Sequence, residues 1–260
     1  AKFSQNKKKH ISITYINKNM LDVNKLPQVD YIIYCLKNNN IKISNSYFNQ
    51  FLKILKNFKK KPKILFTSSG AVYGTNTNKK KDIESKKIDD SSIDNFVGYK
   101  NKYAKEKVFL EKRFKDLAQK NYKVSIARCY TFIGKNIIHY NYAISDLINA
   151  ANNKTKIILN SNIDVFRSYM HSDDLSKWLI TILKNSNTKC PIYNVGSDKV
   201  INLKDLTKKI GIMSNKEISV KIKKSKKFDY YIPSINKAYK KLNLKISINL
   251  NDALNSIIKA

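Results

Sequence analysis

Three side chains in this sequence have types and spacing suited to proton transfer: Ser69, Tyr103 and Lys107. Ser69 lies in a run of small residues that follows the apolar segment Ile64–Phe66, as expected where a buried parallel strand ends at an active-site edge. Tyr103 and Lys107 are spaced i, i+4, so a helix places both on one face. Together they form a candidate site for moving a proton on or off a hydroxyl group.

The tyrosine is the candidate acid–base group. A phenol has a reference pKa of about 10 and is a poor base at neutral pH. A lysine ammonium nearby favours the phenolate, so we expect Lys107 to lower the pKa of Tyr103. Ser69 would hold the same oxygen of a sugar or alcohol and share its proton. Because no side chain can carry a hydride, oxidation of the adjacent carbon requires a bound cofactor.

The order of these residues resembles the NAD-dependent epimerase/dehydratase family of nucleotide-sugar enzymes, which are extended short-chain dehydrogenases/reductases. The family pattern is a strand, then Ser-Ser-x-x-Val-Tyr-Gly, then Tyr-x-x-x-Lys-x-x-x-Glu. This chain has Ser68-Ser69-Gly70-Ala71-Val72-Tyr73-Gly74, then Tyr103, Lys107 and Glu111. The resemblance implies that Ser69 is the catalytic hydroxyl and Tyr103 the acid/base. It also implies that Lys107 binds the nicotinamide ribose and that Tyr103 contacts the cofactor, NAD or NADP.

The resemblance further implies an α/β fold: a Rossmann-like, doubly wound parallel sheet, N-terminally truncated, with a small C-terminal α/β substrate domain. We expect residues 1–134 to form the cofactor-binding domain. Residues 135–260 would form mainly the substrate domain, with some segments returning to the sheet. Helical spacing of apolar residues over Asn45–Phe58 and the apolar strands at Val29–Cys35 and Val124–Tyr130 agree with this order.

The same resemblance assigns cofactor contacts near the start of the chain. Asp22 follows a strand expected at Ile11–Ile16, where the family has an acid that contacts adenine. Tyr34, Cys35 and Leu36 stand where the family has His-Ala-Ala beside the cofactor diphosphate. We therefore predict cofactor contacts at Asp22, Tyr34 and Cys35, with bulky side chains that narrow the cofactor channel.

Substrate contacts are predicted farther along the chain. The segment from Phe166 to Leu175 resembles the family's R-D-(F/Y)-(I/V)-H-V-x-D-(L/V), whose arginine binds the nucleotide phosphates, so Arg167 is the best substrate residue. The alternative is a structural arginine paired with Asp173 or Asp174. Thr131 replaces the asparagine of R-x-F-N-x-x-G-P and is assigned to the substrate together with Ser69.

The family's opening glycine loop has no counterpart in this sequence. The chain holds six glycines, and the first is Gly70. In the family those glycines let the backbone approach the cofactor pyrophosphate at a helix N-terminus. Either the sequence is a truncated piece of a normal enzyme, which the retained site residues favour, or it is a relative that lost this half-site. In both cases we expect weak cofactor binding and an open apolar sheet edge.

The net charge of +32 and the pI near 9.9 ordinarily point to nucleic acid or an anionic membrane as a partner. Of the 51 basic residues, however, only Arg113, Arg128 and Arg167 are arginines, and nucleic-acid interfaces use arginine heavily. We interpret the lysines as solvated surface that also attracts a diphosphate-bearing substrate. We predict a nucleotide-sugar partner and neither nucleic acid nor membrane; a homodimer is left open.

The cysteines Cys35, Cys129 and Cys190 are scattered and odd in number. This pattern favours reduced, buried thiols of a cytoplasmic protein over a disulfide framework or a metal site. No apolar run in the sequence approaches the length needed to span a membrane.

The residues after the catalytic hydroxyl bear on the reaction. Family dehydratases have Asp-Glu there, whereas this chain has Gly70 and Ala71, which disfavours 4,6-dehydration. The remaining reactions are 4-epimerisation and reduction of a 4-keto group in nucleotide sugars for surface polysaccharides. The alternative is a catalytically impaired fragment or a lysine-rich binding protein on a degenerate scaffold.

Overall fold

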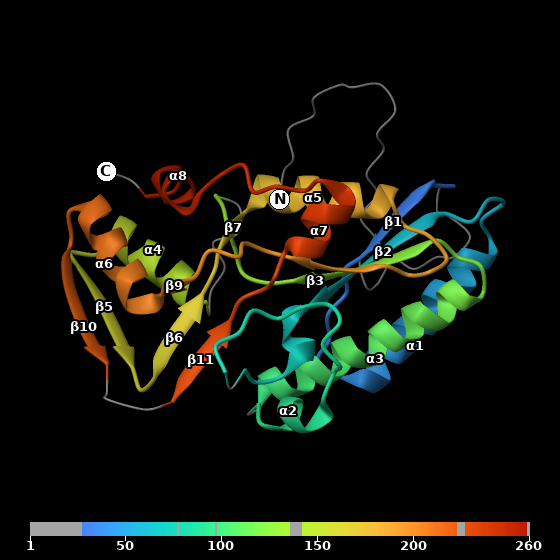
Figure 1. The fold of residues 1–260 in the computed structure, drawn as a ribbon, viewed down its shortest axis with the longest axis horizontal. Helices are drawn as coiled ribbons and strands as arrows, with labels where there is room; N and C mark the ends of the chain where they lie inside the picture. The colour runs from blue at the N-terminus through green and yellow to red at the C-terminus, as the bar shows by residue number, and fades with distance from the viewer. Residues whose placement is uncertain (1–27, 77, 97, 136–141, 223–226, 259–260) are drawn as a thin grey trace.

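A computed structural model describes residues 28–76, 78–96, 98–135, 142–222 and 227–258 (Figure 1). Its main sheet is wholly parallel, in the order β1-β2-β3-β8. The four strands are β1 (Tyr31–Tyr34), β2 (Lys63–Ser69), β3 (Val124–Cys129) and β8 (Ile192–Val195). The two inner strands, β2 and β3, are buried on both faces, which explains their continuous apolar runs.

Helices cover both faces of this sheet. On one face α1 (Ile41–Lys56) and α3 (Tyr99–Gln119) lie side by side and bury an aromatic cluster against the strands (Figure 1). On the other face α5 (Ser172–Lys184) and α7 (Asn236–Leu242) bury a second cluster around Trp178. The predicted α/β fold with a Rossmann-like, doubly wound parallel sheet is therefore confirmed.

The C-terminal part has a core of its own, built from α4 (Ala143–Asn153), α6 (Leu203–Ser214) and α8 (Leu250–Asn255) around the parallel pair β5 (Lys156–Ser161) and β10 (Glu217–Ile222). A three-stranded sheet contains β11 (Phe228–Tyr231), β6 (Asp164–Arg167) and β9 (Ile201–Asn202). The short strands β4 (Phe132–Ile133) and β7 (Met170–His171) form a further pair. Segments beyond residue 134 do return to the main sheet, as β8, α5 and α7; the boundary itself stays a prediction.

Several local predictions need correction. Helix α1 begins before the expected Asn45, because the side chain of Asn40 accepts hydrogen bonds from the backbone of Lys42 and Ile43 and so caps its first turn. The segment between β2 and α3 contains the short helix α2 (Asp90–Asp94), capped by Asp89. The 3-10 turn η1 (Gly70–Tyr73) directly follows β2.

The exposure of residues in and next to the outer strand β1 corrects the prediction that Cys35 is buried. It is the last strand on its side of the sheet formed by the described residues, and Tyr31 and Ile33 are 48% and 42% exposed. Cys35 is exposed as well, so its predicted burial is wrong, whereas Cys190 is buried. All three cysteines are free thiols. The strand expected at Ile11–Ile16 lies outside the described residues.

Among the described residues, none of the helices is long and apolar enough to cross a membrane.

A buried ion pair ties α3 to the sheet. Glu111 on α3 accepts hydrogen bonds from Arg128 on β3, from Nε at 2.9 Å and from Nη2 at 2.7 Å. It also accepts a 2.7 Å hydrogen bond from the Ser68 hydroxyl on β2. The Arg128 guanidinium lies 4.6 Å from the centre of the Tyr73 ring. With both charges almost completely buried, this geometry fixes how α3 is rotated against the two strands.

Replacing Glu111→Gln should lower the free energy of unfolding by about 3–5 kcal/mol, because it leaves the Arg128 charge buried without a counter-charge. Urea unfolding monitored by circular dichroism measures this. The control is Glu217→Gln, which breaks the exposed pair with Lys156 and should change stability by less than about 1 kcal/mol. Equal effects of the two substitutions would contradict the role given to Glu111.

Candidate active site

The predicted catalytic residues meet where β2 ends against α3. Ser69 is buried at the last position of β2, and its Oγ accepts a 3.2 Å hydrogen bond from the backbone of Ala71. Tyr103 is half-buried on the second turn of α3. Burial raises the pKa of the Tyr103 phenol to about 12, although the nearby Ser69 hydroxyl acts in the opposite direction. The structure therefore brings Ser69 and Tyr103 together.

Lys107 lies one turn farther along α3 and is buried. Its Nζ donates to the carbonyl of Thr67 at 3.0 Å and to that of Leu36 at 3.3 Å, so it joins the ends of β1 and β2. Burial lowers the pKa of Lys107, with Glu106 opposing the shift. An ammonium group has three protons, and the described residues supply no third acceptor. One donor is thus left for a ligand.

Glu106, which the sequence analysis did not single out, places the segment that follows β1. It is completely buried and accepts hydrogen bonds from the backbone of Asn38 at 3.0 Å and of Asn39 at 2.7 Å. This anchors the loop whose Leu36 carbonyl receives Lys107.

The prediction that Lys107 lowers the pKa of Tyr103 is wrong. The Lys107 ammonium is directed to two carbonyls and lies 5.7 Å from the centre of the Tyr103 ring. Desolvation dominates, so the pKa of Tyr103 is raised rather than lowered. The phenol is protonated at neutral pH and is ready to donate.

The cofactor contacts predicted near β1 have mixed outcomes. The ring of Tyr34 packs into the core, so the prediction that its bulk narrows the cofactor channel is wrong. The rings around it are those of Phe48, Phe51, Phe66 and Phe114. Cys35 is exposed, as alternation along the strand requires. Backbone contacts of this segment with a cofactor stay a prediction, and Asp22 lies outside the described residues.

Arg167 is already paired, but not with the predicted acids. Its Nη2 lies 2.6 Å from Oδ2 of Asp229, and its Nη1 donates to the Asp229 carbonyl at 3.1 Å. The alternative pairing with Asp173 or Asp174 is therefore wrong, since Asp174 instead accepts backbone hydrogen bonds from 247 and 248. Burial raises the pKa of Asp229, but Arg167 and Lys100 outweigh it and the net shift is downward.

The other predicted substrate residue, Thr131, donates its hydroxyl to the carbonyl of Ser168. His171 accepts a hydrogen bond from the backbone of Asp173 and so caps α5.

Three further residues, none of them predicted from the sequence, form a connected cluster next to Ser69. The hydroxyl of Tyr231, at the end of β11, lies 3.1 Å from Ser69 Oγ. The ring of Tyr130 lies 4.4 Å from that of Tyr231, and its hydroxyl donates to the buried carboxylate of Asp82 at 3.0 Å. No sequence spacing marks these three, because they come from separate segments.

Gly70 is the one signal that could have pointed to this cluster. A Cβ at position 70 would lie 2.4 Å from Cζ of Tyr130, closer than any side chain tolerates. The ring of Tyr130 thus fills the space next to Ser69 that a side chain at position 70 would need.

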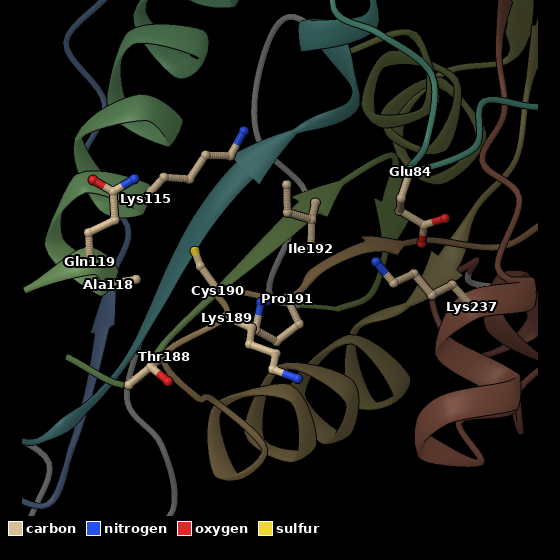
Figure 2. A pocket seen from close by; sticks show the side chains of 10 residues that line it. All are labelled: Glu84, Lys115, Ala118, Gln119, Thr188, Lys189, Cys190, Pro191, Ile192 and Lys237. Atoms are coloured by element: carbon tan, nitrogen blue, oxygen red, sulfur yellow. The ribbon is translucent and has the colours of Figure 1, made fainter. Parts of the chain in front are cut away.

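A pocket of about 420 Å³ lies elsewhere (Figure 2). Its lining includes Lys115 near the end of α3 and Cys190 and Ile192 at the start of β8. Ser69, in contrast, stands at the carboxyl end of β2, which β3 separates from β8, so this pocket is separate from the candidate active site.

Comparison with known proteins identifies the family of this chain. The profile of the NAD dependent epimerase/dehydratase family matches residues 17–196, more than half of the 260-residue chain. The chain belongs to this family. No curated protein sequence matches it.

Several solved structures share the fold at low sequence identity. RMD from Pseudomonas aeruginosa, complexed with NADPH, is 17% identical, with 92% of this chain and 84% of that chain covered and a TM-score of 0.72. UDP-N-acetylglucosamine 4-epimerase from Bacillus cereus is 17% identical, with coverages of 92% and 78% and a TM-score of 0.68. UDP-glucose 4-epimerase from Thermotoga maritima, with UDP-glucose, is 16% identical, with coverages of 88% and 76% and a TM-score of 0.66.

Replacing Gly70→Ala should destabilise the protein by about 1–3 kcal/mol, because the new methyl group overlaps the Tyr130 ring in a packed region. Chemical denaturation measures the loss. In a Tyr130→Leu background the same change should cost clearly less, because the ring is gone. If the loss is the same in both backgrounds, the Tyr130 ring is not what excludes a side chain at position 70.

Proposed function

We propose that this chain is a nucleotide-sugar 4-epimerase or 4-keto-reductase that uses NAD or NADP, in the biosynthesis of surface-polysaccharide sugars. The observation that carries the proposal is the convergence of Ser69, Tyr103 and Lys107 at the carboxyl end of β2. Ligands of open parallel sheets bind outside the carboxyl ends of the strands, which is where these three side chains lie.

The residues present fit a nicotinamide cofactor. Lys107 has one proton without an acceptor among the described residues, which suits a ribose hydroxyl, and it lies beside the Tyr103 ring. Lys107 and Tyr103 would hold the nicotinamide ribose. When bound, the cofactor supplies hydride transfer at the sugar carbon.

The protein's own groups handle the sugar oxygen. The Tyr103 phenol, protonated at neutral pH, donates its proton to the oxygen of a ketone as that oxygen gains charge. In the opposite direction its phenolate takes the proton of the sugar hydroxyl. Ser69 holds the same oxygen from the strand side, and Lys107 keeps a positive charge near the phenolate.

The choice of reaction rests on position 70. Removing water from a sugar needs an acid beside the catalytic hydroxyl, and Tyr130 occupies the space for any side chain there. Epimerisation and keto reduction need only Ser69, Tyr103 and Lys107. Arg167 is proposed for the substrate together with Thr131, whose hydroxyl donates to the carbonyl of Ser168, the residue after Arg167. To bind phosphate, the Arg167 guanidinium would have to share its contacts with Asp229.

Tyr103→Phe should lower turnover of nucleotide sugars at least about 100-fold, because the proton donor is lost. NADH or NADPH binding should weaken by no more than about tenfold, as expected for one lost hydrogen bond to the ribose. Cofactor fluorescence titration and assays with UDP-glucose and UDP-N-acetylglucosamine measure both effects. Tyr99→Phe, which alters the exposed ring stacked on Tyr103, is the matched control and should retain activity. Full activity of Tyr103→Phe would overturn the proposal.

Salt-dependent nucleic-acid binding without cofactor binding would favour the alternative, a lysine-rich binding protein.

The direction of reaction should set the pH dependence. Sugar oxidation needs the Tyr103 phenolate, whose fraction rises tenfold per pH unit below a pKa of about 12. Single-turnover oxidation, followed by nicotinamide absorbance, should therefore rise with pH between about 6 and 9, whereas ketone reduction stays nearly level. An oxidation rate independent of pH would show that Tyr103 is not the base.

A further inference from the structure

Tyr231 lies beside Ser69 although the two residues are far apart in the sequence. It ends β11, which pairs with β6 so that Tyr231 stands opposite Arg167. Its hydroxyl lies 3.1 Å from Ser69 Oγ and 3.4 Å from the carbonyl of Cys129. The carbonyl can only accept, so Tyr231 can donate its single phenolic proton either to that carbonyl or to the Ser69 oxygen.

The hydrogen-bonding capacity of Ser69 makes this choice matter. A serine hydroxyl has one proton and two acceptor sites, and the backbone of Ala71 already occupies one acceptor site. If Tyr231 donates to Cys129, Ser69 donates to Tyr231 and keeps one acceptor site free. If Tyr231 donates to Ser69, both acceptor sites are filled and the Ser69 proton is free to donate.

We propose that Tyr231 is a positioning residue that donates its hydroxyl proton to Ser69 and so directs the Ser69 proton toward the sugar oxygen. This inference rests on the proposed function, in which Ser69 donates a hydrogen bond to the sugar oxygen in both the alcohol and the ketone. The single proton of the alcohol goes to the Tyr103 phenolate, and the hydride goes to the nicotinamide. Ser69 and Tyr231 neither gain nor lose a proton.

The surroundings of Tyr231 hold its oxygen in place and keep it protonated. The Tyr130 ring packs against it at 4.4 Å and is itself fixed by the hydrogen bond to Asp82. The Arg167 guanidinium lies 5.8 Å from the centre of the Tyr231 ring. Burial raises the pKa of Tyr231 far above its ordinary value, and the hydrogen bond with Ser69 does not offset this. Tyr231 therefore stays protonated and acts on Ser69 as a hydrogen-bond donor.

The test is a double-mutant cycle of Tyr231→Phe and Ser69→Ala. Tyr231→Phe keeps the ring and should lower kcat about tenfold, as expected for one lost hydrogen bond, with KM within about threefold. In the Ser69→Ala background the same change should have almost no further effect on kcat, because Tyr231 acts through Ser69. Tyr230→Phe, the neighbouring tyrosine that packs on Phe166, is the control and should leave kcat unchanged. Additive effects in the cycle, or equal effects of the two tyrosines, would overturn the proposal.

A second readout needs no turnover and separates this inference from the proposed function. A chain of donors from Tyr231 through Ser69 stabilises the Tyr103 phenolate, so Tyr231→Phe should raise the pKa of Tyr103 in the unliganded protein. Tyrosine 13C NMR titration, with the Tyr103 signal assigned by Tyr103→Phe, measures this pKa. A rise in the Tyr103 pKa that disappears in the Ser69→Ala background supports the action of Tyr231 through Ser69, even if no tested sugar is turned over. An unchanged pKa overturns it even in an active enzyme.

Discussion

The bidentate pair of Glu111 and Arg128 is the interaction on which the site depends. It fixes the rotation of α3 against β2 and β3 in a region from which water is excluded. Lys107 and Tyr103 stand four and eight residues before Glu111, so the orientation set at Glu111 carries to both. A buried ion pair adds little net stability over an apolar pair, but an unpaired buried charge is expensive, which makes any other rotation of the helix unfavourable.

The second constraint comes from the C-terminal part of the chain. β11 extends from the smaller sheet toward the end of β2, and its last residue, Tyr231, reaches Ser69. The backbone of Asp82 pairs with Ile232 and Ser234 just beyond that strand, which ties the loop after β2 to the same place. The candidate catalytic residue Ser69 thus shares one hydrogen-bond network with the C-terminal part of the chain, where the substrate is proposed to bind. This network gives Ser69 a defined orientation before any ligand arrives.

Much of this was predictable from sequence, because the signals were local. Apolar runs located β2 and β3, and the spacing of Tyr103, Lys107 and Glu111 placed these residues on one helix face. Other features depend on contacts between distant segments. Only the fold reveals that Tyr34 points into the aromatic core, that Arg167 pairs with Asp229, or that Tyr130 fills the space beside Gly70.

The sign of the Tyr103 shift shows a further limit of sequence reasoning. Spacing indicates that a lysine is near, but not where its protons point. In the structure two of those protons reach the carbonyls of Thr67 and Leu36, and burial of the phenol dominates the shift of the Tyr103 pKa.

The close approach of Gly70 and Tyr130 also has a consequence for how the sequence can evolve. A side chain at position 70 and an aromatic ring at position 130 exclude each other, so an acid cannot enter at position 70 by a single tolerated substitution. A lineage with this pair would first have to replace Tyr130 by a smaller residue, giving up the contact with Asp82. The two positions therefore have to change in a fixed order, and the intermediate sequence is the less stable one.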